Sequence, residues 1–196
     1  MPEFFEFEVE LAEIRPRIWR RFLLRRNANF YDLHIAIQAC GWQGGHLWAF
    51  MDEEGGVLAG IPDDEFGNPD PDARMVLLST YFTPGSARTC RYVYDFGDNW
   101  EHSITLKRVV RHESDGMRVL VGGERSFPPE DCGGVSGYER IVEFLRSGTD
   151  PWNDRGGDLK EWIGYWRPES FDWSEEARLF SGTGPEGNDL SWEEGA

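Results

Sequence analysis

The most constraining feature of this chain is the alternation of apolar and acidic side chains near its start. Between residues 4 and 11 the apolar positions include Phe5, Phe7, Val9 and Leu11, and glutamates stand between them at positions 6, 8 and 10. A period of two with one charged face predicts a half-exposed β-strand. Arg15-Pro16-Arg17 predicts a turn, and the apolar-rich residues 18–26 predict a second strand that pairs with the first as an antiparallel hairpin.

The rest of the chain predicts a mixture of helices and strands. A helix is expected over residues 31–40, capped by Asn29 or Asp32 and ended by Gly41. Further strands are expected over 46–51, 89–96, 100–110 and 117–122, and helices over 77–82, 138–146, 159–166 and 171–180. Residues 52–72 and 126–137 are rich in Gly and Pro and are expected to be loops.

These elements indicate an α+β fold in a single domain over residues 1–180. The sheet is expected to be mixed but mainly antiparallel, with helices packed on one side. The opening order of strand, strand, helix, strand is ubiquitin-roll-like, which implies nothing about function. Residues 181–196 are rich in Gly and acidic residues, and we expect them to form a flexible tail.

Composition excludes several classes of protein. The 196 residues carry 36 acidic and 20 basic side chains, a formal net charge of −16, but nine Trp and thirteen Phe supply too much apolar area for a disordered acidic chain. No apolar run approaches the ~18 residues of a membrane span, and no basic start precedes an apolar signal segment. We therefore expect a cytoplasmic protein with no membrane partner, whose thiols at Cys40, Cys90 and Cys132 are reduced.

The acidic excess is concentrated in two segments. Eight acidic residues lie in residues 52–72 and eight from Glu169 onward, with Arg178 against them, so the remaining body carries 20 acidic and 19 basic residues. These segments would repel a phosphate backbone, which disfavours nucleic acid as a partner. An acidic protein can also imitate the charge of DNA and occupy a basic protein, and this mimicry is one functional alternative.

Six arginines lie between Arg15 and Arg26. Cross-strand ion pairs with the glutamates at positions 6, 8, 10 and 13 are the simplest interpretation, each contributing a few tenths of a kcal/mol. A local face for nucleic acid or another anionic ligand is the alternative.

Chemistry-bearing side chains are densest at residues 94–102, which include Asp95, Asp98, Glu101 and His102. Turn formation explains most of them, since Asp side chains hydrogen-bond nearby backbone and Gly97 tolerates a positive φ. A general acid–base or metal cluster is the functional alternative.

A zinc site is a further hypothesis. His46, His102 and Cys132, with an acid such as Glu130 or Asp131, offer the nitrogen, sulfur and oxygen ligands that zinc takes. No short paired-ligand motif such as Cys-x-x-Cys is present, so three separate side chains with structural roles are the alternative. Neighbouring carboxylates raise a thiol pKa, which disfavours Cys132 as a nucleophile.

Three segments together resemble one bacterial and archaeal family, the plasmid pRiA4b ORF-three-like proteins. They are IRPRIWRR at 14–21 with LHIAIQ at 33–38 and GWQGGHLWAF at 41–50; YDFGDNWEH at 94–102; and GER at 123–125 with PPEDCGG at 128–134 and GYE at 137–139. The resemblance implies a single α+β domain of undetermined biochemistry, in which some members are labelled as passengers of insertion elements or as resolvase-like.

This chain departs from the family pattern at two positions. Many members have histidine where this chain has Trp48, and cysteine where it has Phe127, so a metal role implied by the resemblance does not transfer directly. A serine recombinase also needs a nucleophilic serine near its N-terminus, and the first serine here is Ser79. Recombinase activity is therefore rejected.

The leading hypothesis is a non-catalytic cytoplasmic accessory or binding protein, associated with mobile elements, that needs no cofactor and takes an unknown protein or small molecule. The binding surface is expected to include Tyr94, Asp95, Asp98, Trp100, Glu101, His102, Glu130, Asp131 and Tyr138. The alternatives are a zinc-dependent hydrolase that uses His46, His102 and Cys132 to activate water, and the DNA mimic. The oligomeric state stays open.

Overall fold

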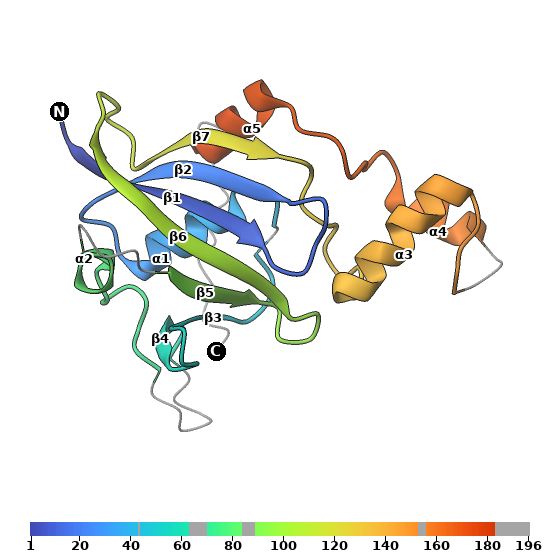
Figure 1. The fold of residues 1–196 in the computed structure, drawn as a ribbon, viewed down its shortest axis with the longest axis horizontal. Helices are drawn as coiled ribbons and strands as arrows, with labels where there is room; N and C mark the ends of the chain where they lie inside the picture. The colour runs from blue at the N-terminus through green and yellow to red at the C-terminus, as the bar shows by residue number, and fades with distance from the viewer. Residues whose placement is uncertain (43, 63–69, 84–88, 153–155, 183–196) are drawn as a thin grey trace, which may run out of the picture.

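The alternating N-terminal strand lies inside a seven-stranded sheet in the computed structural model, which describes residues 1–196 apart from 43, 63–69, 84–88, 153–155 and 183–196. The strands are β1 (Glu3–Leu11), β2 (Trp19–Arg25), β3 (Trp48–Met51), β4 (Val57–Gly60), β5 (Thr89–Tyr94), β6 (Trp100–Arg111) and β7 (Arg118–Glu124). Their order is β4-β3-β5-β6-β1-β2-β7, and every pairing between these strands is antiparallel (Figure 1). The α+β prediction is confirmed, and a bridge between Gly60 and Asp72 is parallel.

The two faces of the sheet differ as the alternation predicts. Phe5, Phe7, Val9 and Leu11 of β1 are fully buried in the main core. On the other face Glu8 pairs with Arg17, Arg21 and Lys107, while Glu6 pairs with Arg108 at 2.6 Å. The ion-pair interpretation of the arginine-rich hairpin is therefore confirmed, with small stabilisation from each exposed pair.

Arg20 is the exception among these arginines, because it points into the core and is fully buried. Its guanidinium donates to the carbonyl oxygens of Glu124 and Arg125 at 3.2 and 2.8 Å. It also stacks on Phe127 and Phe171 at 5.0 and 4.6 Å from the ring centres. Its Nη2 also forms an ion pair with Glu176 Oε1 at 3.2 Å, so the carboxylate, ring and carbonyl partners together replace the water that a charged group loses on burial.

Helix α1 (Phe30–Gln38) covers the core face of the sheet. Asn29 and Asp32 form a reciprocal capping box, so both predicted caps are used, and Leu33 and Ile37 are fully buried. The other helices are α2 (Leu78–Tyr81), α3 (Gly134–Ser147), α4 (Gly156–Ile163) and α5 (Trp173–Phe180). In the described residues, no helix combines the length and apolarity needed to cross a membrane.

The helices do not all cover one face of the sheet. Phe180 of α5 packs against Phe22 in the main core, with ring centres 5.1 Å apart. In contrast, α3 and α4 extend beyond the end of the sheet as a separate helical lobe (Figure 1). This lobe has a small core of its own, formed by Ile141, Phe144, Leu159 and Ile163.

Most element boundaries differ from the sequence prediction by one to three residues, as for α4, which spans Gly156–Ile163 instead of residues 159–166, and two larger differences stand out. Residues 52–72 contain β4 in addition to loop, because Val57–Gly60 pairs with β3 at the edge of the sheet. Helix α3 begins at Gly134 instead of residue 138, since two glycines with positive φ, Gly133 and Gly134, shape its start. The expected tail falls mainly on residues 183–196, outside the described residues.

Candidate functional site

The turn between β5 and β6 is organised by Asp95. This residue has a left-handed backbone conformation (φ 56°), and its Oδ1 accepts a hydrogen bond from the Gly97 amide at 2.9 Å. The Asn99 amide donates to the Asp95 carbonyl oxygen at 2.6 Å and closes the turn. These contacts hold the Asp95 carboxylate in place and leave its second oxygen, Oδ2, for other partners.

His46 reaches the same place from the segment before β3. The Asp95 amide donates to the Leu47 carbonyl oxygen at 2.9 Å, and the Gly45 amide donates to the Tyr94 hydroxyl at 3.2 Å. These bonds hold the two segments side by side. His46 Nδ1 lies 3.7 Å from Asp95 Oδ2, and 32% of the His46 side chain remains exposed.

The loop between β7 and α3 supplies two further carboxylates. Asp131 Oδ1 lies 3.2 Å from His46 Nε2, and Glu130 Oε2 lies 3.9 Å from the same nitrogen. The Tyr94 hydroxyl donates to Glu130 Oε1 at 2.9 Å. Burial, together with the nearby Glu130 carboxylate, raises the pKa of Tyr94, so its hydroxyl stays protonated as a donor.

Two glycines let this loop lie directly against the turn. The Gly133 amide donates to Asp98 Oδ2 at 3.0 Å. A Cβ at Gly134 would lie 2.6 Å from the Asp98 carbonyl oxygen, and a Cβ at Gly137 would lie 1.7 Å from that of Cys132. The close approach of loop and turn, which brings Asp131 near Asp95, therefore needs glycine at these positions.

The resulting cluster has the composition and spacing of a metal site. One ligand atom from each of His46, Asp95 and Asp131 lies within 4.8 Å of the others. Two nitrogen or oxygen ligands of one ion, each about 2.1 Å from it, lie up to about 4.2 Å apart. A divalent cation held by all three would bring their ligand atoms within this distance of one another, with Glu130 beside them.

His102 does not join this cluster. It is fully buried, its Nε2 accepts a hydrogen bond from the Trp42 indole at 3.0 Å, and its Nδ1 lies 3.0 Å from the Trp100 carbonyl oxygen and 3.2 Å from that of Tyr92. Burial lowers the pKa of His102 to about 4, so the ring is neutral. Both ring nitrogens are engaged in the core, so the hypothesis that His102 converges with His46 and Cys132 is wrong, and His46 instead lies among carboxylates.

Cys132 lies beside the cluster but is not activated. Its Sγ lies 3.9 Å from the Gly134 carbonyl oxygen. Burial and the carboxylates of Asp98, Glu130 and Asp131 raise the pKa of the Cys132 thiol to about 12. A neutral thiol is a poor nucleophile and a poor zinc ligand, which agrees with the sequence argument against a nucleophilic role.

The two departures from the family pattern are part of the aromatic core. Trp48 stacks on His34 with ring centres 3.9 Å apart and an interplanar angle of 13°. Phe127 stacks on His102 with ring centres 6.1 Å apart. Neither position supplies a metal ligand in this chain.

Three other residues expected on the binding surface face elsewhere. Trp100 is buried and packs against Trp42, with ring centres 5.4 Å apart. Glu101 lies 3.6 Å from Arg91 in an ion pair, and Tyr138 is buried where its hydroxyl accepts from Arg125 at 3.3 Å. The described geometry thus gathers Tyr94, Asp95, Glu130 and Asp131 around His46, while Asp98 holds the loop to the turn.

The sequence pattern does not predict that Asp95 and His46 are partners. Both residues stand out as chemistry-bearing, but they are 49 positions apart in the sequence and no local spacing links them. Leu47 and Phe96, the apolar side chains beside them, are exposed, and the sequence pattern does not predict this exposure either. The only signal was that Asp95 lies near the end of the strand predicted over residues 89–96, and the structure ends this strand at Tyr94.

Comparisons with known proteins extend over most of the chain. The sequence model of a family described as "Plasmid pRiA4b ORF-3-like protein" matches residues 3–175. A protein of Sinorhizobium fredii described as "Uncharacterized protein y4hQ" is 34% identical over 175 residues, which cover 89% of this chain and 85% of that protein. The crystal structure of a protein of unknown function, MM3350 from Methanosarcina mazei Go1, is similar with a TM-score of 0.77 and 33% identity, covering 89% of this chain and 98% of that one.

Proposed function

This chain belongs to the plasmid pRiA4b ORF-3-like family, and from this premise we propose that it is a binding protein whose site holds a divalent cation. The observation that carries the proposal is the meeting of His46, Asp95 and Asp131, whose ligand atoms lie within 4.8 Å of one another. These residues come from three separate segments. The hydrogen bonds that join the segments are independent of any ion.

The ligand types narrow the choice of cation. One imidazole nitrogen and two or three carboxylate oxygens suit Zn²⁺, Mn²⁺ or Fe²⁺ better than Ca²⁺ or Mg²⁺, which prefer oxygen alone. Glu130 is held by the Tyr94 hydroxyl at 2.9 Å, so its second oxygen is oriented toward His46 at 3.9 Å. An ordered outer partner of this kind strengthens metal binding in known sites.

A binding role fits the open side of the site. Asp131 exposes 74% of its side chain, whereas Asp95 and Glu130 expose 12% and 11%. A cation held from the buried side would present free coordination positions to a carboxylate, phosphate or carbonyl group of a protein or small-molecule partner. Within the cell we propose a cytoplasmic role linked to mobile elements, supported by the free thiols and by the plasmid in the family's description.

A metal-dependent hydrolase is the second candidate, and the same exposure favours it. Water in an open coordination position of Zn²⁺ has a pKa lowered to about 7, which makes a nucleophile near neutral pH. In this version His46, Asp95 and Asp131 hold the ion, in place of the set of His46, His102 and Cys132 expected from sequence. Mimicry of DNA stays a hypothesis, because its acidic segments include residues 63–69 and 183–196, outside the described residues.

Metal analysis of the full chain tests the proposal. Protein purified without chelator is expected to carry, or to take up on titration with Zn²⁺ or Mn²⁺, about one equivalent of metal. His46→Gln and Asp131→Asn are each expected to weaken binding by about 10-fold or more. His112→Gln is the matched control, since His112 is exposed at the far end of β6. Absence of saturable binding of either ion, or equal binding by all three variants, would overturn the proposal.

Turnover separates the two candidates. Metal-loaded protein is assayed on p-nitrophenyl phosphate and p-nitrophenyl acetate. Hydrolysis that His46→Gln abolishes and His112→Gln retains supports the hydrolase. One equivalent of tightly bound metal with no turnover supports the binding role.

A further inference from the structure

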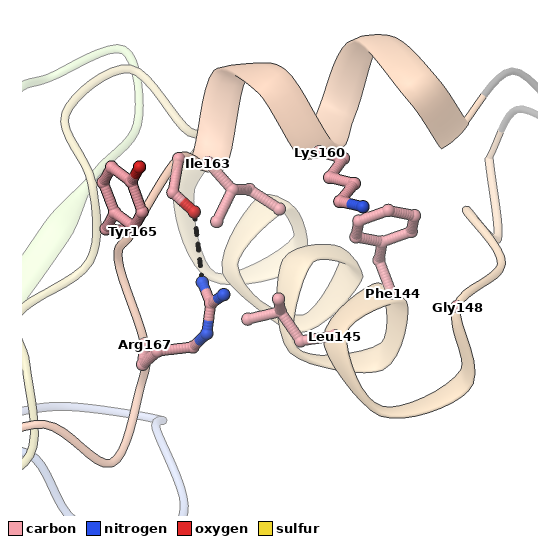
Figure 2. A pocket seen from close by; sticks show the side chains of 8 residues that line it. Phe144, Leu145, Gly148, Lys160, Ile163, Tyr165 and Arg167 are labelled. Carbon is pink, nitrogen blue, oxygen red and sulfur yellow. Dashed lines mark hydrogen bonds between the residues drawn. The ribbon is translucent and has the colours of Figure 1, made fainter.

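The helical lobe contains an open hollow that is separate from the cation site. It lies between α3 and α4, has a volume of about 450 Å³, and is lined mainly by Phe144, Leu145, Lys160, Ile163, Tyr165 and Arg167 (Figure 2). Sites for small organic ligands commonly have volumes of roughly 300–1,000 Å³. The hollow is therefore large enough for a molecule of about ten non-hydrogen atoms.

Glycines at two helix ends border this space. Gly148 follows α3 with φ 75°, and Gly164 follows α4 with φ 57°, so both occupy the left-handed conformation that ends many helices. A Cβ built at either glycine would meet no other atom within 4 Å. The two turns thus end at the hollow without filling it.

The lining combines an apolar floor with two positively charged side chains, Lys160 and Arg167. Leu145 and Ile163 lie in the middle of the hollow, with Lys160 on one side and Arg167 on the other (Figure 2). Arg167 Nη1 donates to the carbonyl oxygens of Gly164 and Trp166 at 3.1 and 2.6 Å. This anchors the guanidinium, while its Nε and Nη2 carry further N–H groups that can be donated.

The charge of the lining contrasts with that of the protein. The chain has a net charge of −16 and only two lysines, Lys107 and Lys160. No carboxylate is among the residues that line the hollow in the described part of the chain. An apolar floor with cations at its sides complements a molecule that has an apolar body and a negative end.

We propose that this hollow binds a small amphipathic carboxylate. The apolar body lies on Leu145 and on the exposed edges of Phe144 and Ile163, whose other atoms belong to the core of the lobe. The carboxylate accepts hydrogen bonds from Nε and Nη2 of Arg167, with the Lys160 ammonium adding attraction from the opposite side. Arg167 is the direct partner because a guanidinium can pair with both carboxylate oxygens at once. Nothing in this proposal depends on a metal ion at His46.

The experiment titrates the full chain with octanoate and with octan-1-ol, the neutral counterpart of equal length, and follows the methyl signals of Leu145 and Ile163 by NMR. Octanoate is expected to shift these signals saturably and to bind about 10-fold more tightly than octan-1-ol, the ratio that one charge-assisted contact supplies. Arg167→Gln is expected to weaken octanoate binding by about 10-fold, and Arg167→Lys by less.

Two controls keep the test selective. Lys160→Gln is expected to weaken octanoate binding by about 3-fold, because it removes a more distant charge. Lys107→Gln changes the other lysine, which lies 3.7 Å from Glu8 on the sheet, and is expected to bind octanoate as the unmodified chain does. Circular dichroism checks that each variant is folded.

Three outcomes would overturn the proposal. They are equal binding of octanoate and octan-1-ol, octanoate binding that Arg167→Gln leaves unchanged in folded protein, and shifts confined to residues outside the lobe. Sedimentation tests a second copy of this chain as the occupant. A dimer that protects these methyl groups and that octanoate does not dissociate would also contradict the carboxylate assignment.

Discussion

His46 and His102 both contact tyrosines of β5, but one histidine is partly exposed among carboxylates and the other is buried in the core. His46 is about one-third exposed and faces three carboxylates at 3.2 to 3.9 Å. His102 is fully buried, with both ring nitrogens engaged by the Trp42 indole and by backbone carbonyl oxygens. The difference shows that a histidine in a recognisable motif can hold the core together, while the one beside it stays available for a ligand.

The largest expected difference is in the free energy of unfolding when each of the two histidines is replaced by alanine. His102→Ala leaves a cavity and an unpaired buried indole N–H, so the free energy of unfolding should fall by about 3–4 kcal/mol. His46→Ala should change it by about 0.5 kcal/mol or less, because its side chain is partly exposed and makes no core hydrogen bond. Urea denaturation of both variants measures this, and equal losses of stability would remove the distinction between core and site histidine.

A somewhat smaller effect is expected from alanine at two glycines with similar φ. Gly134→Ala combines left-handed strain with a Cβ 2.6 Å from the Asp98 carbonyl oxygen, and should lower stability by about 3 kcal/mol and weaken Zn²⁺ binding. Gly148→Ala carries the strain alone, since its Cβ meets nothing within 4 Å, and should lower stability by about 1 kcal/mol with unchanged Zn²⁺ affinity.

Calorimetric metal titration and urea denaturation measure both quantities for these two glycine variants. If both variants behave alike, the close approach of loop and turn does not position the cation ligands.

The smallest expected effect is the change in the free energy of unfolding with pH. Burial lowers the pKa of His102 to about 4 and that of His34 to about 3, whereas an unfolded histidine takes up a proton near pH 6.5. The unfolded state therefore binds more protons as pH falls below 6.5, and the free energy of unfolding decreases toward pH 4. From pH 7.5 to 5.5 the loss should be about 2–3 kcal/mol, roughly half of it from each histidine.

Urea denaturation at these two pH values measures the loss. His46→Gln should retain it, because His46 is not buried in the core, and His34→Gln should show less of it. A pH-independent stability over this range would contradict the neutral, buried state of the two core histidines.

Much of the fold is readable along the chain. The alternation at Phe5, Phe7, Val9 and Leu11 marks a strand with one core face, and Asn29 with Asp32 marks the start of α1. Both patterns are local, because a strand repeats every two residues and a helix cap spans three or four. Val57–Gly60 escapes prediction, because its pairing with β3 is what makes this short, Gly-flanked segment a strand.

The candidate site shows the same division more sharply. His46, Asp95, Glu130 and Asp131 are visible in the sequence as groups that could bind or react, and the neutral thiol of Cys132 follows from its acidic neighbours. Which of these groups meet is decided by contacts between distant segments: the Asp95 amide on Leu47, the Gly133 amide on Asp98, and the glycines that allow them.

The sequence by itself determined the α+β class, the amphipathic sheet, the caps and the family, because each depends on residue order within a few positions or on motifs in a row. The tertiary structure alone decided that His102 is buried in the core, that His46 has carboxylates as neighbours, and that an open hollow between α3 and α4 is lined by the basic side chains of Lys160 and Arg167. Burial and charge environment depend on chain segments that fold together from far apart, and no local period encodes them.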